Sequence, residues 1–132
     1  MDVEDWLAAR SDDFQALHAA IGDLVRARWP DAERKVVGEG SYEMPAYVVP
    51  VPEHPPRESW TGTMPHDVFI IAPTEKKAGV TTHLWHPNRP GLIQENAEWL
   101  AAAGYKPMVG CLQWNRKATM DLDALARLLD DV

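Results

Sequence analysis

The sequence predicts a single α+β domain in which helices pack on a mainly antiparallel sheet of about four strands. Apolar residues with helical spacing occur near both ends of the chain, and strand-like apolar runs follow one another through short turns. A doubly wound fold requires strict alternation of helices and strands, and the expected elements do not alternate in this way. The length of 132 residues fits one core. We therefore expect residues 1–132 to form one domain with N-terminal helices, one inserted helix and a C-terminal helix.

Two helices are expected first. Apolar residues recur at steps of three and four along residues 12–29, so that one apolar stripe faces the core. Ser11 or Asp12 can cap the start, and Pro30 ends the helix because the residue before a proline avoids helical geometry. A shorter helix over residues 3–9 precedes it, with acidic residues at its positive end.

Strands are expected over residues 41–51, 67–73, 80–86 and 106–114. These runs are rich in valine, isoleucine and aromatic residues, which suit a pleated surface. The short turn over residues 74–79 makes the second and third runs hairpin partners. These strands account for the predicted antiparallel sheet.

Prolines mark the one long loop. Six of the eleven prolines lie between residues 45 and 65, and a regular ladder cannot form there because proline lacks a backbone N–H. We expect a proline-rich loop insertion at about 50–66, with Trp60 near its centre. Long loops in compact domains are often functional. The alternative for Trp60 is that it folds back on the edge of the core.

Two more helices complete the expected order. Residues 89–105 carry an apolar stripe and stop at Gly104, a residue typical of helix C-termini. Residues 119–132 carry another apolar stripe, and Thr119 or Asp121 can cap its start. The expected order is two helices, three strands, a helix, a strand and a final helix.

The composition limits the classes of partner. The net charge is −7 and the pI is near 5.1, so we expect neither nucleic acid nor a membrane surface as a partner. The N-terminal segment is acidic where a secretory signal needs positive charge, and no apolar run is long enough to cross a bilayer. The single cysteine, Cys111, cannot form an internal disulfide, which fits a reducing compartment. These features predict a cytoplasmic protein.

Two histidines three positions apart, His83 and His86, raise the question of a metal site. In an extended strand, alternate side chains point to opposite faces. The two imidazoles therefore diverge, and we do not expect this pair to chelate one ion. Thr81 and Trp85 share the face of His83, whereas the opposite face carries apolar side chains and is expected to face the core.

An aromatic sheet face is the candidate binding site. Aromatic walls with few polar groups suit small-molecule pockets. We expect a small molecule or a partner protein to bind there, and the alternative is an ordinary half-buried aromatic cluster. The predicted ligand-binding residues are Tyr42, Tyr47, Trp60, His83, Trp85 and Trp114, with Gln113 as a possible neighbour.

No residue pattern predicts catalysis. His66 beside Asp67, and His54 beside Glu53, point apart in an extended chain, and no nucleophile accompanies them. We predict no catalytic residues, no metal ligands and no cofactor, which describes a non-enzymatic domain. A small hydrolase-type enzyme that uses His66 or His83 is the least supported alternative.

Several segments resemble the YdhG-like domain family of bacterial proteins. These segments are "WPDAERKV", "YEMPAYVV", "VFIIAPTEKKAGVTTHLW" and "MDLDALARLL", so the resemblance spans nearly the whole chain. The sequence departs from the family pattern at Glu43, where glycine is usual, and at Ala78, where a histidine often follows the lysine pair. The resemblance implies a compact α+β fold in a small cytoplasmic protein, in a family whose function is largely unassigned.

One relative in that family is described as an intracellular iron chaperone similar in role to frataxin. The resemblance therefore implies a second hypothesis, in which the chain carries metal on carboxylates. The acidic residues near the N-terminus, including Asp12 and Asp13, offer the oxygen ligands that hard cations prefer. Their alternative explanation is that helix starts favour negative charge.

The sequence leaves the oligomeric state open.

Overall fold

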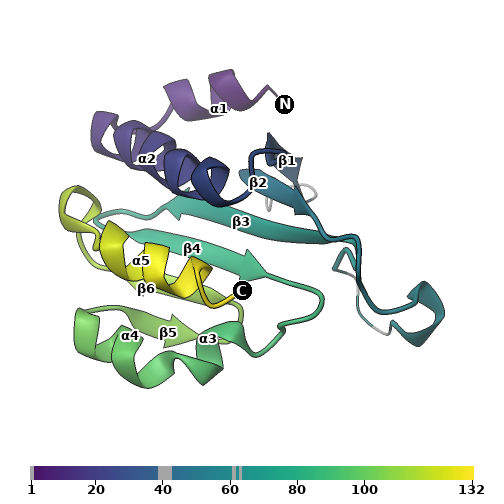
Figure 1. Cartoon of the computed structure of the whole chain (residues 1–132). Helices are drawn as coiled ribbons and strands as arrows, with labels where there is room; N and C mark the ends of the chain where they lie inside the picture. Colours follow the sequence, from purple (N-terminus) through teal and green to yellow (C-terminus); the bar gives the residue numbers. More distant parts are fainter. Residues whose placement is uncertain (1, 39–42, 61, 63) are drawn as a thin grey trace.

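The computed structural model describes residues 2–38, 43–60, 62 and 64–132, which form an α+β fold (Figure 1). Its sheet has six strands, each antiparallel to its neighbours, in the order β1-β2-β3-β4-β6-β5. The strands are β1 (Glu33–Val37), β2 (Met44–Pro50), β3 (Val68–Glu75), β4 (Val80–Trp85), β5 (Lys106–Met108) and β6 (Cys111–Trp114). The predicted fold class is confirmed, but the sheet has two strands more than the four expected.

The first additional strand is β1. Three of its five residues are charged, and it lies at one edge of the sheet. It pairs with β2, with Glu33 opposite Val48 and Val37 opposite Met44. Charged side chains are common on edge strands because they oppose pairing with other chains. Because only Val36 and Val37 are apolar, β1 has no apolar run of strand length.

The second additional strand arises from a turn inside residues 106–114. Gly110 has a φ of +82°, a conformation that glycine adopts without steric cost. The chain reverses there, so that Met108 pairs with Cys111. This segment is therefore the hairpin β5–β6 and not the single strand that we expected.

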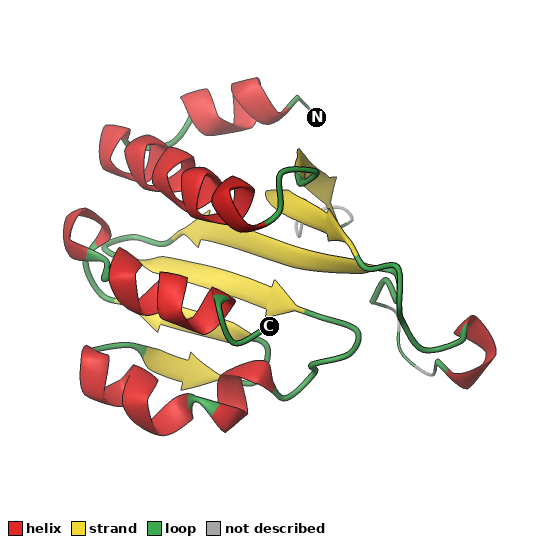
Figure 2. Cartoon of the chain, in the orientation of Figure 1, coloured by secondary structure: helices red, strands yellow, loops and turns green. Residues whose placement is uncertain are grey.

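Five α-helices in the described residues lie on one face of the sheet (Figure 2). They are α1 (Val3–Ala8), α2 (Asp12–Arg28), α3 (Leu92–Glu95), α4 (Ala97–Ala103) and α5 (Leu122–Leu129), with 3-10 turns at Arg57–Ser59 and Lys117–Thr119. Ser11 caps α2 and Asp121 caps α5. The helix expected over 89–105 is interrupted at Asn96 and ends, as predicted, before Gly104. None of the described helices combines the length and the apolar character that a membrane crossing requires.

The two faces of the sheet have different surroundings. On the helix-covered face, strand residues pack with the helices in one core: Tyr47, Val49, Phe69, Ile71, Val80, Leu84 and Leu112. The opposite face, which we call the helix-free face, is formed by the alternate strand residues: Glu33, Lys35, Val37, Met44, Ala46, Val48, Val68, Ile70, Ala72, Thr74, Thr81, His83, Trp85, Lys106, Met108, Cys111 and Gln113. No described helix lies over this second face (Figure 2).

Candidate functional site

The alternation predicted for residues 80–86 is confirmed. Leu84 lies in the core beneath the helices, whereas His83 pairs with Ala72 on the helix-free face. The His86 ring packs against Phe69 of the core, with ring centroids 5.1 Å apart. The imidazoles of His83 and His86 therefore lie on opposite faces and do not approach one ion.

A small apolar cluster occupies the centre of the helix-free face. Ala46, Val48, Ile70 and Ala72 are buried, and Trp85 is among the larger side chains that pack around them. Val48 lies directly opposite Ile70 on the neighbouring strand, and such cross-strand pairs exclude water from each other. The face therefore has an apolar centre although no described helix covers it.

The loop between β2 and β3 returns to the helix-free face through Trp60. The Trp60 ring packs edge-on against Trp85, with centroids 5.2 Å apart and planes at 71°. The Trp85 indole N–H donates to the Pro65 carbonyl over 2.8 Å, and the Asn88 amide donates to the Glu53 carbonyl. The two indoles therefore pack directly on each other at this end of the face.

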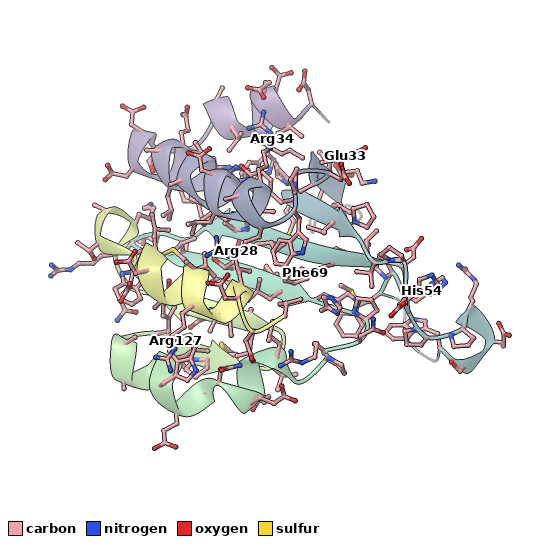
Figure 3. The ribbon with its side chains drawn as sticks, in the orientation of Figure 1. Arg28, Glu33, Arg34, His54, Phe69 and Arg127 are labelled. Carbon is pink, nitrogen blue, oxygen red and sulfur yellow. The ribbon has the colours of Figure 1, made fainter. Side chains whose placement is uncertain are left out.

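The same loop brings together two histidines that the sequence did not suggest as neighbours. The rings of His54 and His66 lie 5.0 Å apart and nearly perpendicular, at 84°. Figure 3 shows His54 where the loop leaves the strand ends. Within the described ranges, no group of three or more His, Cys, Asp or Glu side chains is placed to hold a metal ion.

The carboxylates considered for metal carriage have local roles. Asp2 caps α1 by accepting a hydrogen bond from the Glu4 backbone N–H over 2.9 Å. Glu4 itself forms an ion pair with Arg34 on β1. Asp12 and Asp13 lie in the first turn of α2, where the helix dipole favours negative charge. Helix capping and the helix dipole therefore account for these acids.

His83 and Cys111 face each other across β4 and β6. Burial, together with the positive charge of Lys76, lowers the pKa of His83, so the imidazole is neutral at pH 7. Burial raises the pKa of the Cys111 thiol, and Lys76 opposes this effect only in part. Because the thiolate and not the thiol is the nucleophile, the pair lacks the activated cysteine of a hydrolase.

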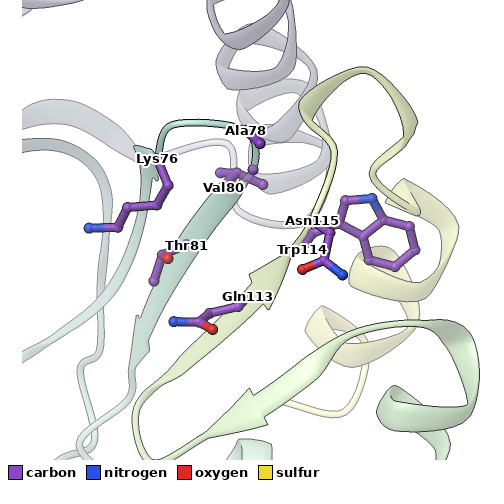
Figure 4. Close-up of a pocket in the computed structure, with 8 residues that line it drawn as sticks. Lys76, Ala78, Val80, Thr81, Gln113, Trp114 and Asn115 are labelled. Atoms are coloured by element: carbon purple, nitrogen blue, oxygen red, sulfur yellow. The ribbon is translucent and has the colours of Figure 1, made fainter.

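A hollow of about 280 Å³ opens at the other end of the helix-free face, beside the turn between β3 and β4 (Figure 4). Lys76, Thr81 and Gln113 project to one side of the sheet, whereas the Trp114 ring points the other way (Figure 4). Gly79 also lines the hollow, and a Cβ there would overlap the Trp114 carbonyl oxygen, so the close approach requires glycine. The remaining lining residues are Ala78, Val80 and Asn115.

The structure brings together three of the six predicted ligand-binding residues. Trp60, His83 and Trp85 all lie at the helix-free face. Tyr42 lies outside the described residues. Gln113, considered as a neighbour, lies on the same face opposite Thr81. The predicted aromatic face is therefore smaller than expected.

Tyr47 and Trp114 are placed on the other side of the sheet. Tyr47 pairs with Ile71 inside the core, and Trp114 packs on Tyr105 with ring centroids 4.7 Å apart. Both positions follow from strand alternation, because Tyr47 is adjacent to Val48 and Trp114 is adjacent to Gln113. Neither aromatic ring belongs to the helix-free face.

Tyr47 forms a buried pair with His18 on α2, which the sequence argument missed. The tyrosine hydroxyl donates to the His18 carbonyl over 2.7 Å and lies 3.1 Å from His18 Nδ1. Gly22 makes room for this hydroxyl, because a Cβ there would overlap it. Burial, together with the charge of Arg34, lowers the pKa of His18 to about 4. The sequence contains one sign of this pair, because His18 falls within the apolar stripe of α2 and is therefore expected to face the core.

The helix-free face is thus the candidate functional site. It carries the Trp60–Trp85 pair at one end, the apolar cluster at its centre and the polar hollow beside Lys76 at the other end. No family model, curated protein or solved structure matches the chain.

Proposed function

We propose that the chain is a non-enzymatic binding domain that takes a small molecule or a partner protein on its helix-free face. The observation that supports this function best is an apolar cluster between two tryptophans and a polar hollow, on a sheet face without a covering helix. The four cluster residues are themselves at most 5% exposed, so a ligand would contact the partly buried side chains packed around them, which include Met44 and Trp85. Apolar groups rimmed by polar ones are typical of binding sites.

The enzyme alternative has less support. In the described residues, neither the His66 ring nor the His83 ring forms a hydrogen bond with a carboxylate. No acidic side chain therefore orients either ring for proton transfer. The raised pKa of the Cys111 thiol also disfavours nucleophilic catalysis. The α+β class agrees with the fold that the resemblance to the YdhG-like family implies, and membership of that family remains a proposal.

The six tryptophans lie at different places in the structure, so their indole N–H signals can show where a ligand binds. Trp60 and Trp85 lie at the helix-free face, whereas four others pack against the core on the helix-covered side: Trp6, Trp29, Trp99 and Trp114. Each indole N–H gives one signal in a ¹⁵N-labelled sample. A ligand on the helix-free face is therefore distinguished from one elsewhere by which signals move.

The experiment combines native mass spectrometry with these indole signals. The protein is purified from its own host to detect a retained mass, and a library of small acids, amines and neutral compounds is then added to labelled protein. We expect the Trp60 and Trp85 signals to move and the other four to stay. Trp85→Ala should abolish stabilisation by the ligand in a folded protein. Movement only of the four core-side signals, or no retained mass and no shift, would contradict the proposed function.

A further inference from the structure

We propose that the hollow beside the β3–β4 turn binds the carboxylate group of a small amphiphilic monocarboxylate, whose apolar body lies along β4 towards Trp85. This inference rests on the proposed function and names the ligand class for the same face. It selects a small molecule over a protein partner. Its evidence is the set of donors at the hollow, the charges around it and the side chains between the hollow and Trp85.

The strand register places several hydrogen-bond donors side by side. Thr81 lies opposite Gln113, and Gln113 lies opposite Lys106 on the next strand. Lys76 closes the β3–β4 turn, where its backbone N–H donates to the Gly79 carbonyl over 3.0 Å. Its side chain projects to the same side as Thr81 and Gln113 (Figure 4). An ammonium group, a hydroxyl and an amide thus lie on the same side of the sheet at one hollow (Figure 4).

Lys76 lines the hollow, and Lys106 lies beside it on the next strand, opposite Gln113. Among the described residues, Lys76 and Lys106 have no ion-pair partner, whereas Lys117 on the other face contacts Glu75 at 3.0 Å. Lys76 also acts on His83 and on the Cys111 thiol electrostatically, which places its charge over the helix-free face. This positive potential stands out in a chain of net charge −7, and it attracts an anion.

The donor set favours a carboxylate over a phosphate. Phosphate sites typically use arginine forks, helix N-termini or successive backbone N–H groups, and no arginine lines this hollow. One ammonium group with neutral donors balances a single negative charge. The volume of about 280 Å³ lies just below the range of about 300–1,000 Å³ for small-molecule pockets, so the group that enters is small.

The path from the hollow to Trp85 fits an apolar body. Thr81 and Trp85 are four residues apart on one strand, a distance of about 13 Å at roughly 3.3 Å per residue. His83 lies between them, with small side chains, Ala72 and Cys111, directly opposite on the two neighbouring strands. A second copy of this chain fits the face poorly, because its own lysines would meet the same positive charges.

The test compares octanoate with octanamide, which has the same length and no charge. Binding to the full chain is measured by ¹⁵N NMR titration at low salt, with the Gln113 side-chain amide and the Trp85 indole as reporters. We expect octanoate to bind on the order of tenfold more tightly than octanamide, to move both reporters and to weaken as salt is added.

Two lysines of the same turn provide a matched pair of variants. Lys76 lines the hollow and the adjacent Lys77 does not, although both are exposed. Lys76→Met should weaken octanoate binding about tenfold, and Lys77→Met should leave it within about twofold. Gln113→Leu should weaken binding by a smaller factor. Thermal melting of each variant confirms that the protein stays folded.

Several results would overturn this inference. They are absence of octanoate binding, equal binding of octanoate and octanamide, equal effects of the Lys76 and Lys77 variants, or shifts that cluster away from the hollow. If neutral compounds still move the Trp60 and Trp85 signals, the proposed function stands and only the carboxylate inference fails. If no compound moves those signals and the purified protein retains no mass, both fail.

Discussion

The two faces of the sheet are built from the same strands, yet different forces determine them. In β4, Val80 and Leu84 enter a core shared with five helices, while His83 and Trp85 lie on a face without a covering helix. On the helix-covered face, close packing of large side chains dominates. On the helix-free face, apolar, polar and cationic side chains lie together, and no described helix packs on them.

The ion pairs show the same division. On the helix-covered side, Arg28 on α2 contacts Asp130 at 2.7 Å (Figure 3). Lys117 contacts Glu75, which also accepts hydrogen bonds from Ser11 at the start of α2. These contacts hold the helices and the β3–β4 turn together. Lys76 at the hollow and Lys106 beside it lack such partners among the described residues, and this contrast leads to a series of tests.

The largest expected effect separates two adjacent isoleucines. Ile71 is 0% exposed in the main core, and Ile70 is 5% exposed in the small cluster of the helix-free face. Ile71→Ala should lower the free energy of unfolding by about 4 kcal/mol, because it leaves a cavity between sheet and helices. Ile70→Ala should cost about 2 kcal/mol, since water and neighbouring side chains can fill its space. Urea denaturation measures both, and equal costs would show that the two faces are packed alike.

The second effect concerns the buried histidine of the covered face. Folding lowers the pKa of His18 from 6.5 to about 4, so the folded state favours the neutral ring. Its stabilisation is complete above pH 6.5 and is lost as the pH falls towards 4, by about 3 kcal/mol in total. Between pH 7.5 and 5.5, where carboxylates titrate little, the loss is about 1 kcal/mol.

His18→Gln tests this assignment. The variant should remove most of the pH dependence of the free energy of unfolding between pH 7.5 and 5.5. His83→Gln on the helix-free face is the matched control. This variant should keep most of the pH dependence of the free energy of unfolding, because His83 is only partly buried. A pH slope that survives in the His18 variant would assign the effect to another group.

Strand alternation explains which parts of the site the sequence predicted. It separated His83 from His86 correctly, because β4 is a regular strand that pairs with β3 without interruption from Val80 to Trp85. Alternation alone did not show which face of β2 points to the helices and carries Tyr47, since every residue from Pro45 to Val49 is buried and neither face has a polar signature. The tertiary partner of Tyr47, the His18–Gly22 turn of α2, decides its direction.

The loop and the hollow depend on contacts far apart in sequence. The contact between Trp60 and Trp85 joins a proline-rich segment to a strand 25 positions later, and no local pattern encodes it. The hollow needs the turn at Gly110, which moves residues 111–114 beside β4. Gln113 was expected only as a possible neighbour of the face that carries His83, and no residue pattern indicated a cavity beside it.

A smaller effect is expected from the ion pair between Lys117 and Glu75, which lies beside the β3–β4 turn. Lys117 and Glu75 are only 15% and 17% exposed, and the Lys117 ammonium also donates to the Lys76 carbonyl over 3.1 Å. Lys117→Met should cost about 1–2 kcal/mol, because it leaves the Glu75 carboxylate half-buried without its cation. Lys77→Met, which removes an exposed charge from the same turn, should cost less than about 0.5 kcal/mol. Equal costs would mean that the ion pair does not hold the turn.

The smallest effect on stability is expected at the loop. Trp60 is half-buried against Trp85 and lies outside the main core, so Trp60→Ala should cost about 1 kcal/mol, well below the value for a tryptophan buried in a core. The same change should expose Trp85, because Trp60 covers one side of its ring. We expect faster hydrogen exchange of the Trp85 indole N–H, with exchange unchanged at Trp29, which packs against the core on the other side of the sheet. A loss of several kcal/mol, or faster exchange at both indoles, would show that the loop belongs to the core and does not form one wall of a binding face.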